Sequence, residues 1–221
     1  MKKSAAAVCA VMLFSCAVMA LVDGVIQPGY AAKSLVKACL FLALPLLCAR
    51  FFPGIRFRDL FRFRKKGFFA ALGLGIGLYG LILGAYFLVR YFFDFSAIAG
   101  NLSQTAGVTK DNFLFVALYI SFANSLLEEF FFRGFGFMVL KEASTRRFAY
   151  LFSGVVFSLY HTAMMIGWFS PLLFLLVLTG LAVGGMIFSF LNEKLGCIYP
   201  SWLVHMFANF AINTIGFLLL A

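Results

Sequence analysis

The chain has 221 residues, of which 64% are hydrophobic and only 12% are charged, and its mean hydropathy is +1.02. Soluble globular domains carry about 25% charged residues, so this composition excludes a soluble domain and indicates an integral membrane protein. The net charge of +10 would suggest nucleic-acid binding in a soluble protein. Here we attribute it to membrane topology and expect no nucleic-acid partner.

Apolar stretches recur along the whole chain. About seven of them are near or above the roughly 17–25 residues that a helix needs to cross a bilayer. They cover residues 4–22, 35–52, 67–89, 113–140, 148–166, 171–192 and 199–220. The connections between them are too short for a soluble domain. The sequence therefore predicts an all-α fold, a polytopic transmembrane helical bundle forming a single domain over residues 1–221, and leaves its oligomeric state open.

Basic residues predict how this bundle is oriented in the bilayer. The loop after the second span is strongly basic, carrying Arg50, Arg56, Arg58, Arg62, Arg64, Lys65 and Lys66 against Asp59. By the positive-inside rule this loop is cytoplasmic, and so is the N-terminus. Residues 51–69 also alternate arginine with phenylalanine, which is typical of a segment lying at the lipid headgroups. The first span resembles a signal peptide, but we interpret it as retained, with cleavage as the alternative.

Two further features concern helix packing. The second span carries Lys37 near its outer end and Pro45 inside, so we expect it to be kinked or offset. Pairs of glycines four residues apart predict close helix contacts in the third and sixth spans. These pairs are Gly73 with Gly77, Gly80 with Gly84, and Gly180 with Gly184.

The fourth span contains two adjacent glutamates, Glu128 and Glu129. A carboxylate at membrane depth is costly and therefore indicates function. Glu129 and Arg133 have the i,i+4 spacing of an ion pair, and we interpret this pair as structural. Glu128 is rotated by about 100° and shares a polar stripe with Ser121, Asn124 and Ser125, which we expect to line a wet cavity. This interpretation leaves Glu128 free to act.

The two histidines of the chain, His161 and His205, both lie inside spans. Phe157 precedes His161 by four residues and Asn209 follows His205 by four, so each pair shares one helix face. Glu128 and His161 are both about 20 Å of helix from the same turn, which places them at one level. His205 can reach a similar level. We therefore expect a chemical site where these spans meet.

In chain order, the polar residues form the patterns EExxxR (Glu128, Glu129, Arg133), FxxxH (Phe157, His161) and HxxxN (His205, Asn209). Over residues 113–213 this arrangement resembles the CAAX-protease and bacteriocin-processing (Abi/CPBP) family of intramembrane endopeptidases. The resemblance implies hydrolysis of a peptide or membrane-protein substrate in the bilayer, in a multi-pass protein of a prokaryotic cytoplasmic membrane. It also implies that Glu128 and His161 activate a water molecule, that His205 and Asn209 form an oxyanion hole, and that Glu129, Arg133 and Phe157 support the site.

Alternatives stay open at this point. A divalent metal such as zinc could be held by Glu128, His161 and His205, although the chain lacks an HExxH motif, and we favour a mechanism without a cofactor. Two other functional classes fit buried carboxylates and histidines. One is a proton-coupled transporter, and the other is a non-catalytic immunity or scaffold protein.

Overall fold

The computed structural model describes residues 3–52, 55, 57–65, 67–95, 98, 100 and 109–220, so the predicted loop residues Arg56 and Lys66 lie outside the described residues. Over these residues the chain is helical and has no strand. Among the described residues, seven helices are long and apolar enough to cross a membrane: Lys3–Ile26, Tyr30–Phe51, Phe68–Val89, Phe113–Ala143, Arg146–Met165, Pro171–Leu195 and Tyr199–Leu219. The predicted all-α bundle with seven spans is confirmed.

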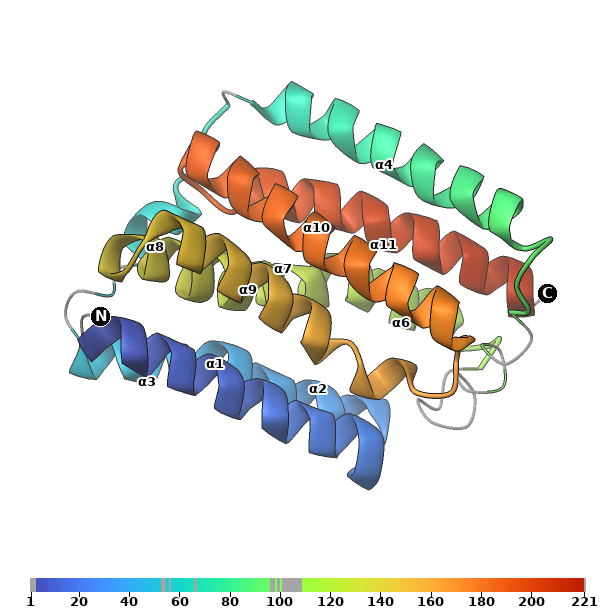
Figure 1. Ribbon diagram of the computed structural model, residues 1–221, viewed down its shortest axis with the longest axis horizontal. Coiled ribbons are helices and arrows are strands. Elements are labelled where there is room, and N and C mark those ends of the chain that lie inside the picture. The colour runs from blue at the N-terminus through green and yellow to red at the C-terminus, as the bar shows by residue number, and fades with distance from the viewer. Residues whose placement is uncertain are drawn as a thin grey trace.

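The helices are arranged in layers, with the fourth span inside the bundle (Figure 1). One side is formed by the first two spans, which consist of α1 (Lys3–Leu21), η1 (Val22–Ile26), α2 (Tyr30–Ala38), η2 (Cys39–Ala43) and α3 (Leu44–Phe51). The other side contains α10 (Pro171–Leu195) and α11 (Tyr199–Leu220), with α4 (Phe68–Val89) outermost against α11. Between the two sides lie the fourth span and α9 (Arg146–Tyr160). Polar residues of the fourth span can therefore meet groups from both sides.

The fourth span is not a uniform α-helix. It consists of α6 (Phe113–Tyr119), η4 (Ile120–Asn124), α7 (Ser125–Glu128), η5 (Glu129–Met138) and α8 (Val139–Ala143), in which η4 and η5 are π-helical. Every residue from Glu129 to Phe137 is buried, so this part of the span has no face on lipid. Short π-helical segments occur frequently at functional sites. The two glutamates stand at the boundary between α7 and η5.

The second span is interrupted where the sequence predicted an irregularity. The π-helical η2 ends directly before α3, and Pro45 is the second residue of α3. Because proline lacks an N–H and its ring clashes with the preceding turn, a regular α-helix cannot continue through it, and the π turn accommodates this. Lys37, at the end of α2, is only 4% exposed. It therefore lies inside the bundle.

The predicted glycine contacts are wrong. A Cβ atom built on Gly73, Gly77, Gly80 or Gly84 meets nothing within 4 Å, and the same holds for Gly180 and Gly184. Close approaches occur instead at Gly75, where a Cβ would lie 2.6 Å from the Phe207 ring, and at Gly185, where it would lie 3.3 Å from the Cα atom of Gly154. For the four glycines of α4 the reason is that this helix packs mainly against α11, so much of its surface faces outward.

The basic segment after the second span closes one end of the bundle. Its short helix η3 (Arg58–Phe61) places Leu60 in the interior, and the Leu60 carbonyl accepts a hydrogen bond from Ile198 N at 3.0 Å. The Phe57 and Phe61 rings pack against Phe130, with ring centres 5.0 and 5.9 Å away. The phenylalanines thus attach the segment to the fourth span, while the side chains of Arg62, Arg64 and Lys65 are exposed.

Candidate active site

Glu128 is buried, and one of its oxygens is held by a lysine from the second span. The Lys37 Nζ atom lies 2.5 Å from Glu128 Oε1 and also donates to Asn124 Oδ1 at 2.5 Å. Asn124 Nδ2 in turn donates to Glu128 Oε1 at 3.0 Å. Glu128 therefore has a charged partner, which the sequence interpretation of this residue as free to act did not include. Counting residues along the second span gives the depth of Lys37 but not the helix face on which it lies, so the sequence did not reveal this contact.

The other oxygen of Glu128 faces both imidazoles. Glu128 Oε2 lies 3.7 Å from His205 Nε2 and 4.0 Å from His161 Nε2. These separations are longer than a direct hydrogen bond. The structure thus brings together the three titratable groups that the sequence placed at one level, with one face of the carboxylate bound to a cation and the other turned toward two rings.

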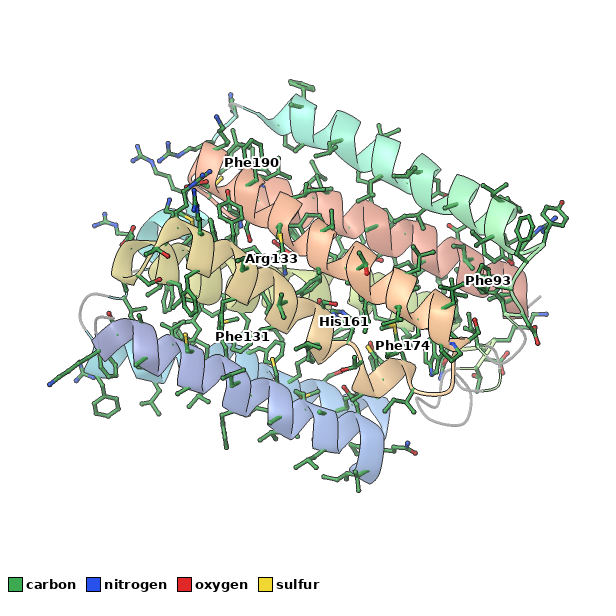
Figure 2. The ribbon with its side chains drawn as sticks, in the orientation of Figure 1. Phe93, Phe131, Arg133, His161, Phe174 and Phe190 are labelled. Atoms are coloured by element: carbon green, nitrogen blue, oxygen red, sulfur yellow. The ribbon has the colours of Figure 1, made fainter. Side chains whose placement is uncertain are left out.

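His161 follows the last residue of α9 (Figure 2), and the backbone fixes its tautomer. Its Nδ1 atom lies 2.8 Å from the carbonyl oxygen of Phe157. A carbonyl can only accept, so Nδ1 carries the hydrogen. In a neutral ring Nε2 is then an acceptor, and it is this atom that faces Glu128. The Phe157 ring also contacts the imidazole, with ring centres 4.7 Å apart.

His205 lies between the two glutamates. Its Nδ1 atom is 2.9 Å from Glu129 Oε1, while its Nε2 atom faces Glu128. The ring stacks on Phe188 of α10 with ring centres 5.3 Å apart, and the side chain is 7% exposed. A contact between His205 and Glu129 was not predicted from the sequence, because spacing along one helix carries no information on neighbours from another helix.

The predicted ion pair between Glu129 and Arg133 is present and fully buried. Arg133 Nη1 lies 3.4 Å from Glu129 Oε1, and both side chains have 0% exposure. Within the described part of the chain the guanidinium nitrogens and Glu129 Oε2 have no aligned hydrogen bond. Instead the Arg133 guanidinium lies over the Phe157 ring, 3.9 Å from its centre, and 5.1 Å from that of Phe188. Aromatic faces therefore stabilise a cation that has few polar partners.

Asn209 contacts the backbone of the fourth span. Its Nδ2 atom donates to the Ile120 carbonyl at 3.2 Å. One turn further along α11, Asn213 donates to the Ala117 carbonyl at 3.2 Å. About one turn before His205, the Trp202 indole donates to the Phe122 carbonyl at 3.0 Å. These side chains form an interhelical hydrogen-bond row against η4 and its flanks. One N–H of Asn209 is thus committed to helix packing, which its spacing from His205 did not indicate.

The predicted polar stripe on the fourth span faces other helices. Asn213 also donates to Ser121 Oγ at 3.1 Å, and Trp202 donates to Ser125 Oγ at 3.0 Å. Asn124 is engaged by Lys37. The stripe therefore points away from lipid, as expected, but its hydroxyl and amide groups are bound by side chains of α11 and α2.

Comparison with known families covers this same part of the chain. Residues 110–211 match a family described as type II CAAX prenyl endopeptidase Rce1-like. This segment is Rce1-like. The match confirms the resemblance to the CAAX-protease family that the three motifs predicted. No curated protein and no solved structure matches the chain. The Rce1-like segment contains every predicted site residue, whereas Lys37 lies outside it.

The side chains at this site bear on the zinc alternative. In the part of the chain that the structure describes, no group of three His, Cys, Asp or Glu side chains could hold a metal ion. The carboxylate that would have to bind the metal already carries the Lys37 ammonium on Oε1. The Lys37 ammonium on Oε1 disfavours zinc at Glu128, His161 and His205, so we propose a mechanism that uses side chains and water alone.

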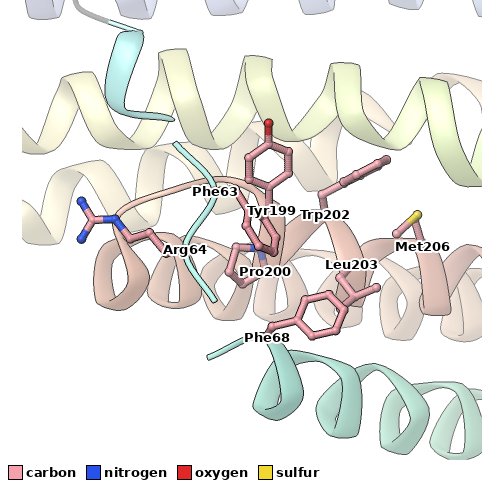
Figure 3. Close-up of a pocket in the computed structure, with 8 residues that line it drawn as sticks. All are labelled: Phe63, Arg64, Phe68, Tyr199, Pro200, Trp202, Leu203 and Met206. Atoms are coloured by element: carbon pink, nitrogen blue, oxygen red, sulfur yellow. The ribbon is translucent and has the colours of Figure 1, made fainter. Parts of the chain in front are cut away.

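A pocket lies at the end of α11 nearest to the basic segment (Figure 3). Its lining is mainly aromatic and aliphatic and includes Phe63, Phe68, Tyr199, Leu203 and Met206. Trp202, which also lines the pocket, donates to the fourth span, as described above. The pocket contains no carboxylate or imidazole, so it offers apolar surface and no reactive group.

Proposed function

We propose that this chain is an intramembrane endopeptidase that cleaves a peptide or membrane-protein substrate. The observation that carries the proposal is the meeting of Glu128 Oε2 with the Nε2 atoms of His205 and His161, at 3.7 and 4.0 Å, inside an Rce1-like segment. A buried carboxylate facing two imidazoles is suited to moving protons to and from a water molecule and a leaving group. The mechanism needs no group from outside the chain except the substrate and water.

Water activation is assigned to Glu128 and His161. Both Glu128 Oε2 and His161 Nε2 are acceptors that face one another, so a water molecule can donate one hydrogen to each. Oε2 takes a proton as the water oxygen bonds to the substrate carbonyl carbon, and the electron pair of the C=O bond moves to oxygen. Bonds from Lys37 and Asn124 to Oε1 keep the other carboxylate oxygen away from the water.

Stabilisation of the resulting oxyanion is assigned to His205 and Asn209. His205 Nδ1 lies beside Glu129, so Nε2 can donate to an oxyanion when the ring carries both hydrogens. The Glu129 carboxylate compensates the positive charge of that ring, and the Glu128 carboxylate does so until it takes the proton of the water. Asn209 has a second N–H that is not used in its bond to Ile120. Donors preorganised in a water-poor site contribute roughly 10²–10³-fold each to the rate.

Product formation returns the proton to the substrate. The tetrahedral intermediate collapses, the C–N bond breaks, and the proton held by Glu128 passes to the departing amine nitrogen. His161 Nε2 lies next to Glu128 and can carry the proton across. Arg133 has no direct part in these steps, since its guanidinium lies against Phe157 and Glu129. It supports the position and charge of Glu129, which in turn holds His205.

The proposal is tested by reconstituting the full chain in liposomes and measuring cleavage of membrane peptides, with and without a prenylated C-terminal cysteine. We expect Glu128→Gln and His161→Ala to abolish cleavage while the fold is retained. Glu193→Gln is the matched control, because Glu193 pairs with Arg146 at the end of α10 and lies outside the site. Equal cleavage by wild type and Glu128→Gln would refute the mechanism, and proton-driven solute flux without proteolysis would support a transporter.

Metal independence is tested separately. We expect the rate of cleavage to be unchanged after dialysis against a strong chelator, because the side chains present supply both the base and the charge compensation. Loss of cleavage that is restored by zinc would overturn the metal-free mechanism.

A further inference from the structure

The most unusual group around Glu128 is Lys37, because it comes from a span outside the Rce1-like segment. We propose that Lys37 is a positioning residue for the reaction, which orients the Glu128 carboxylate by holding Oε1 so that Oε2 faces water and the imidazoles. This inference rests on the proposed endopeptidase function. It makes the second span a part of the working site.

The geometry divides the carboxylate into two unlike oxygens. Oε1 is bound by Lys37 at 2.5 Å and by Asn124 at 3.0 Å, whereas Oε2 faces the two imidazoles at distances too long for a hydrogen bond. Asn124 cannot do this alone, because its amide is itself oriented by Lys37 through Oδ1. Removing the ammonium therefore frees both the carboxylate and the amide to turn.

Charge balance also requires Lys37. The neighbouring carboxylate of Glu129 already has Arg133 and His205 as partners, and the described cation in contact with Glu128 is Lys37. The side chains of Lys37 and Glu128 are each about 5% exposed or less, so water screens their interaction weakly. A buried ion is strongly destabilising when its partner is removed, and an intramembrane lysine is costly in itself. The lysine thus offsets the cost of a buried reactive carboxylate.

Aromatic packing fixes the lysine in this position. Its ammonium lies 5.0 Å from the Tyr160 ring centre and 5.4 Å from that of Phe41, one turn further along the second span. Phe41 is fully buried and stacks on Phe131 of the fourth span with ring centres 3.9 Å apart. This contact attaches the second span to η5 next to the glutamates. The stem of Lys37 therefore approaches Glu128 from a fixed direction.

Steady-state cleavage by the reconstituted full chain tests the positioning role. We expect Lys37→Met to lower kcat by about 100-fold with KM changed less than about threefold, since misorientation by about 1 Å can cost this much. Lys37→Arg keeps a cation, so its kcat should be at least about tenfold higher than that of Lys37→Met. Lys33→Met is the matched control, because Lys33 lies one turn away on α2 and pairs with Asp23. It should keep kcat within about twofold of wild type, although loss of the partner of the buried Asp23 should lower stability.

The outcomes separate this inference from the proposed function. Loss of cleavage by Glu128→Gln together with wild-type kcat in Lys37→Met would overturn the role of Lys37 and leave the endopeptidase intact. A rise in KM for Lys37→Met with an unchanged kcat would equally overturn the role of Lys37. Absence of cleavage by the wild type with every substrate would overturn the function and the positioning role with it.

A second measurement does not depend on activity. Melting temperatures of Lys37→Met, Glu128→Gln and the double variant form a double-mutant cycle. We expect each single variant to melt at lower temperature and the double variant to melt above both, because removing both partners leaves no buried unpaired charge. Additive losses would show that the two side chains are not coupled and would overturn the proposal even where Lys37→Met folds poorly.

Discussion

The guanidinium of Arg133 lies 3.9 Å from the ring centre of Phe157, so the arginine of one sequence motif rests on the phenylalanine of the next. The same phenylalanine accepts the Nδ1 hydrogen bond of His161 through its carbonyl. Phe157 therefore connects the structural ion pair of the fourth span with the imidazole that faces Glu128. The spacing predicted that Phe157 packs beside His161, but it did not predict the contact of Phe157 with Arg133.

The ion pair of Glu129 and Arg133 predicts a large loss of stability for a single substitution. Arg133→Met should destabilise the protein by about 3–5 kcal/mol, because it leaves a buried carboxylate without its cation. The double variant Arg133→Met/Glu129→Gln should recover part of this loss. Denaturation followed in detergent measures both, with Arg147→Met as the control because Arg147 is exposed at the start of α9. A loss as small as that of the control would contradict the interpretation.

Asn209 and Asn213 offer a comparison between catalysis and packing. Both donate to carbonyls of the fourth span at 3.2 Å, and Asn213 also donates to Ser121, so replacement by alanine should cost about 0.6–1.7 kcal/mol of unfolding free energy for Asn209 and at least as much for Asn213. If the second N–H of Asn209 stabilises the oxyanion, Asn209→Ala should also lower kcat by about 100-fold, while Asn213→Ala should not. Equal kcat values for the two variants would remove Asn209 from the oxyanion hole.

The contacts of α4 predict opposite effects for two neighbouring glycines. Gly75→Ala places a Cβ atom 2.6 Å from the Phe207 ring and should destabilise the protein by about 1–3 kcal/mol through overpacking. Gly77→Ala meets open space and should be neutral or stabilising by up to about 1 kcal/mol, because alanine favours a helix. Thermal unfolding of the two variants checks this, and the reverse order would show that α4 presents another face to α11.

The distribution of basic residues predicts the sidedness of the bundle. In a chain whose native cysteines have been replaced, a cysteine at Arg62 should react with an impermeant thiol reagent only after the cytoplasmic face is opened. A cysteine at Asp111 should react from the outside of intact cells. Both positions lie between spans, so labelling should not disturb packing. Labelling of Arg62→Cys in intact cells would reverse the predicted orientation.

The sequence predicted the depth of the site residues in the membrane, but it did not predict which helices contact one another there. Depth follows from counting, because each residue adds about 1.5 Å, and this brought Glu128 level with His161. Which helix faces which depends on packing between distant segments, so the contacts of Lys37 with Glu128 and of His205 with Glu129 were missed. The charge of Lys37 inside an apolar span was itself a signal, since intramembrane ions generally face a partner.

The prediction of close helix contacts at the glycine pairs was wrong for a related reason. Spacing identifies a smooth helix face but not whether a neighbour lies against it, and Gly77 and Gly184 face outward. The π-helical turns had no recognisable pattern, except that Pro45 indicated an irregularity in the second span. Their effect is to change the angle between residues before and after them, which a constant helical step cannot reproduce.

The π turn of η4 places one extra residue in the fourth span. That span has 31 residues, whereas about 20 suffice to cross the hydrocarbon, so a shorter helix would still be inserted. Because a π turn holds one residue more than an α turn, deleting one residue between Ile120 and Asn124 would allow an ordinary α-helix to form while the flanking segments keep roughly their orientation. A deletion in the α-helical α7 would instead turn everything before it by about 100° relative to Glu129, and Ala117 and Ile120 would rotate away from Asn213 and Asn209. The loss of one residue should therefore be tolerated better in η4 than in α7.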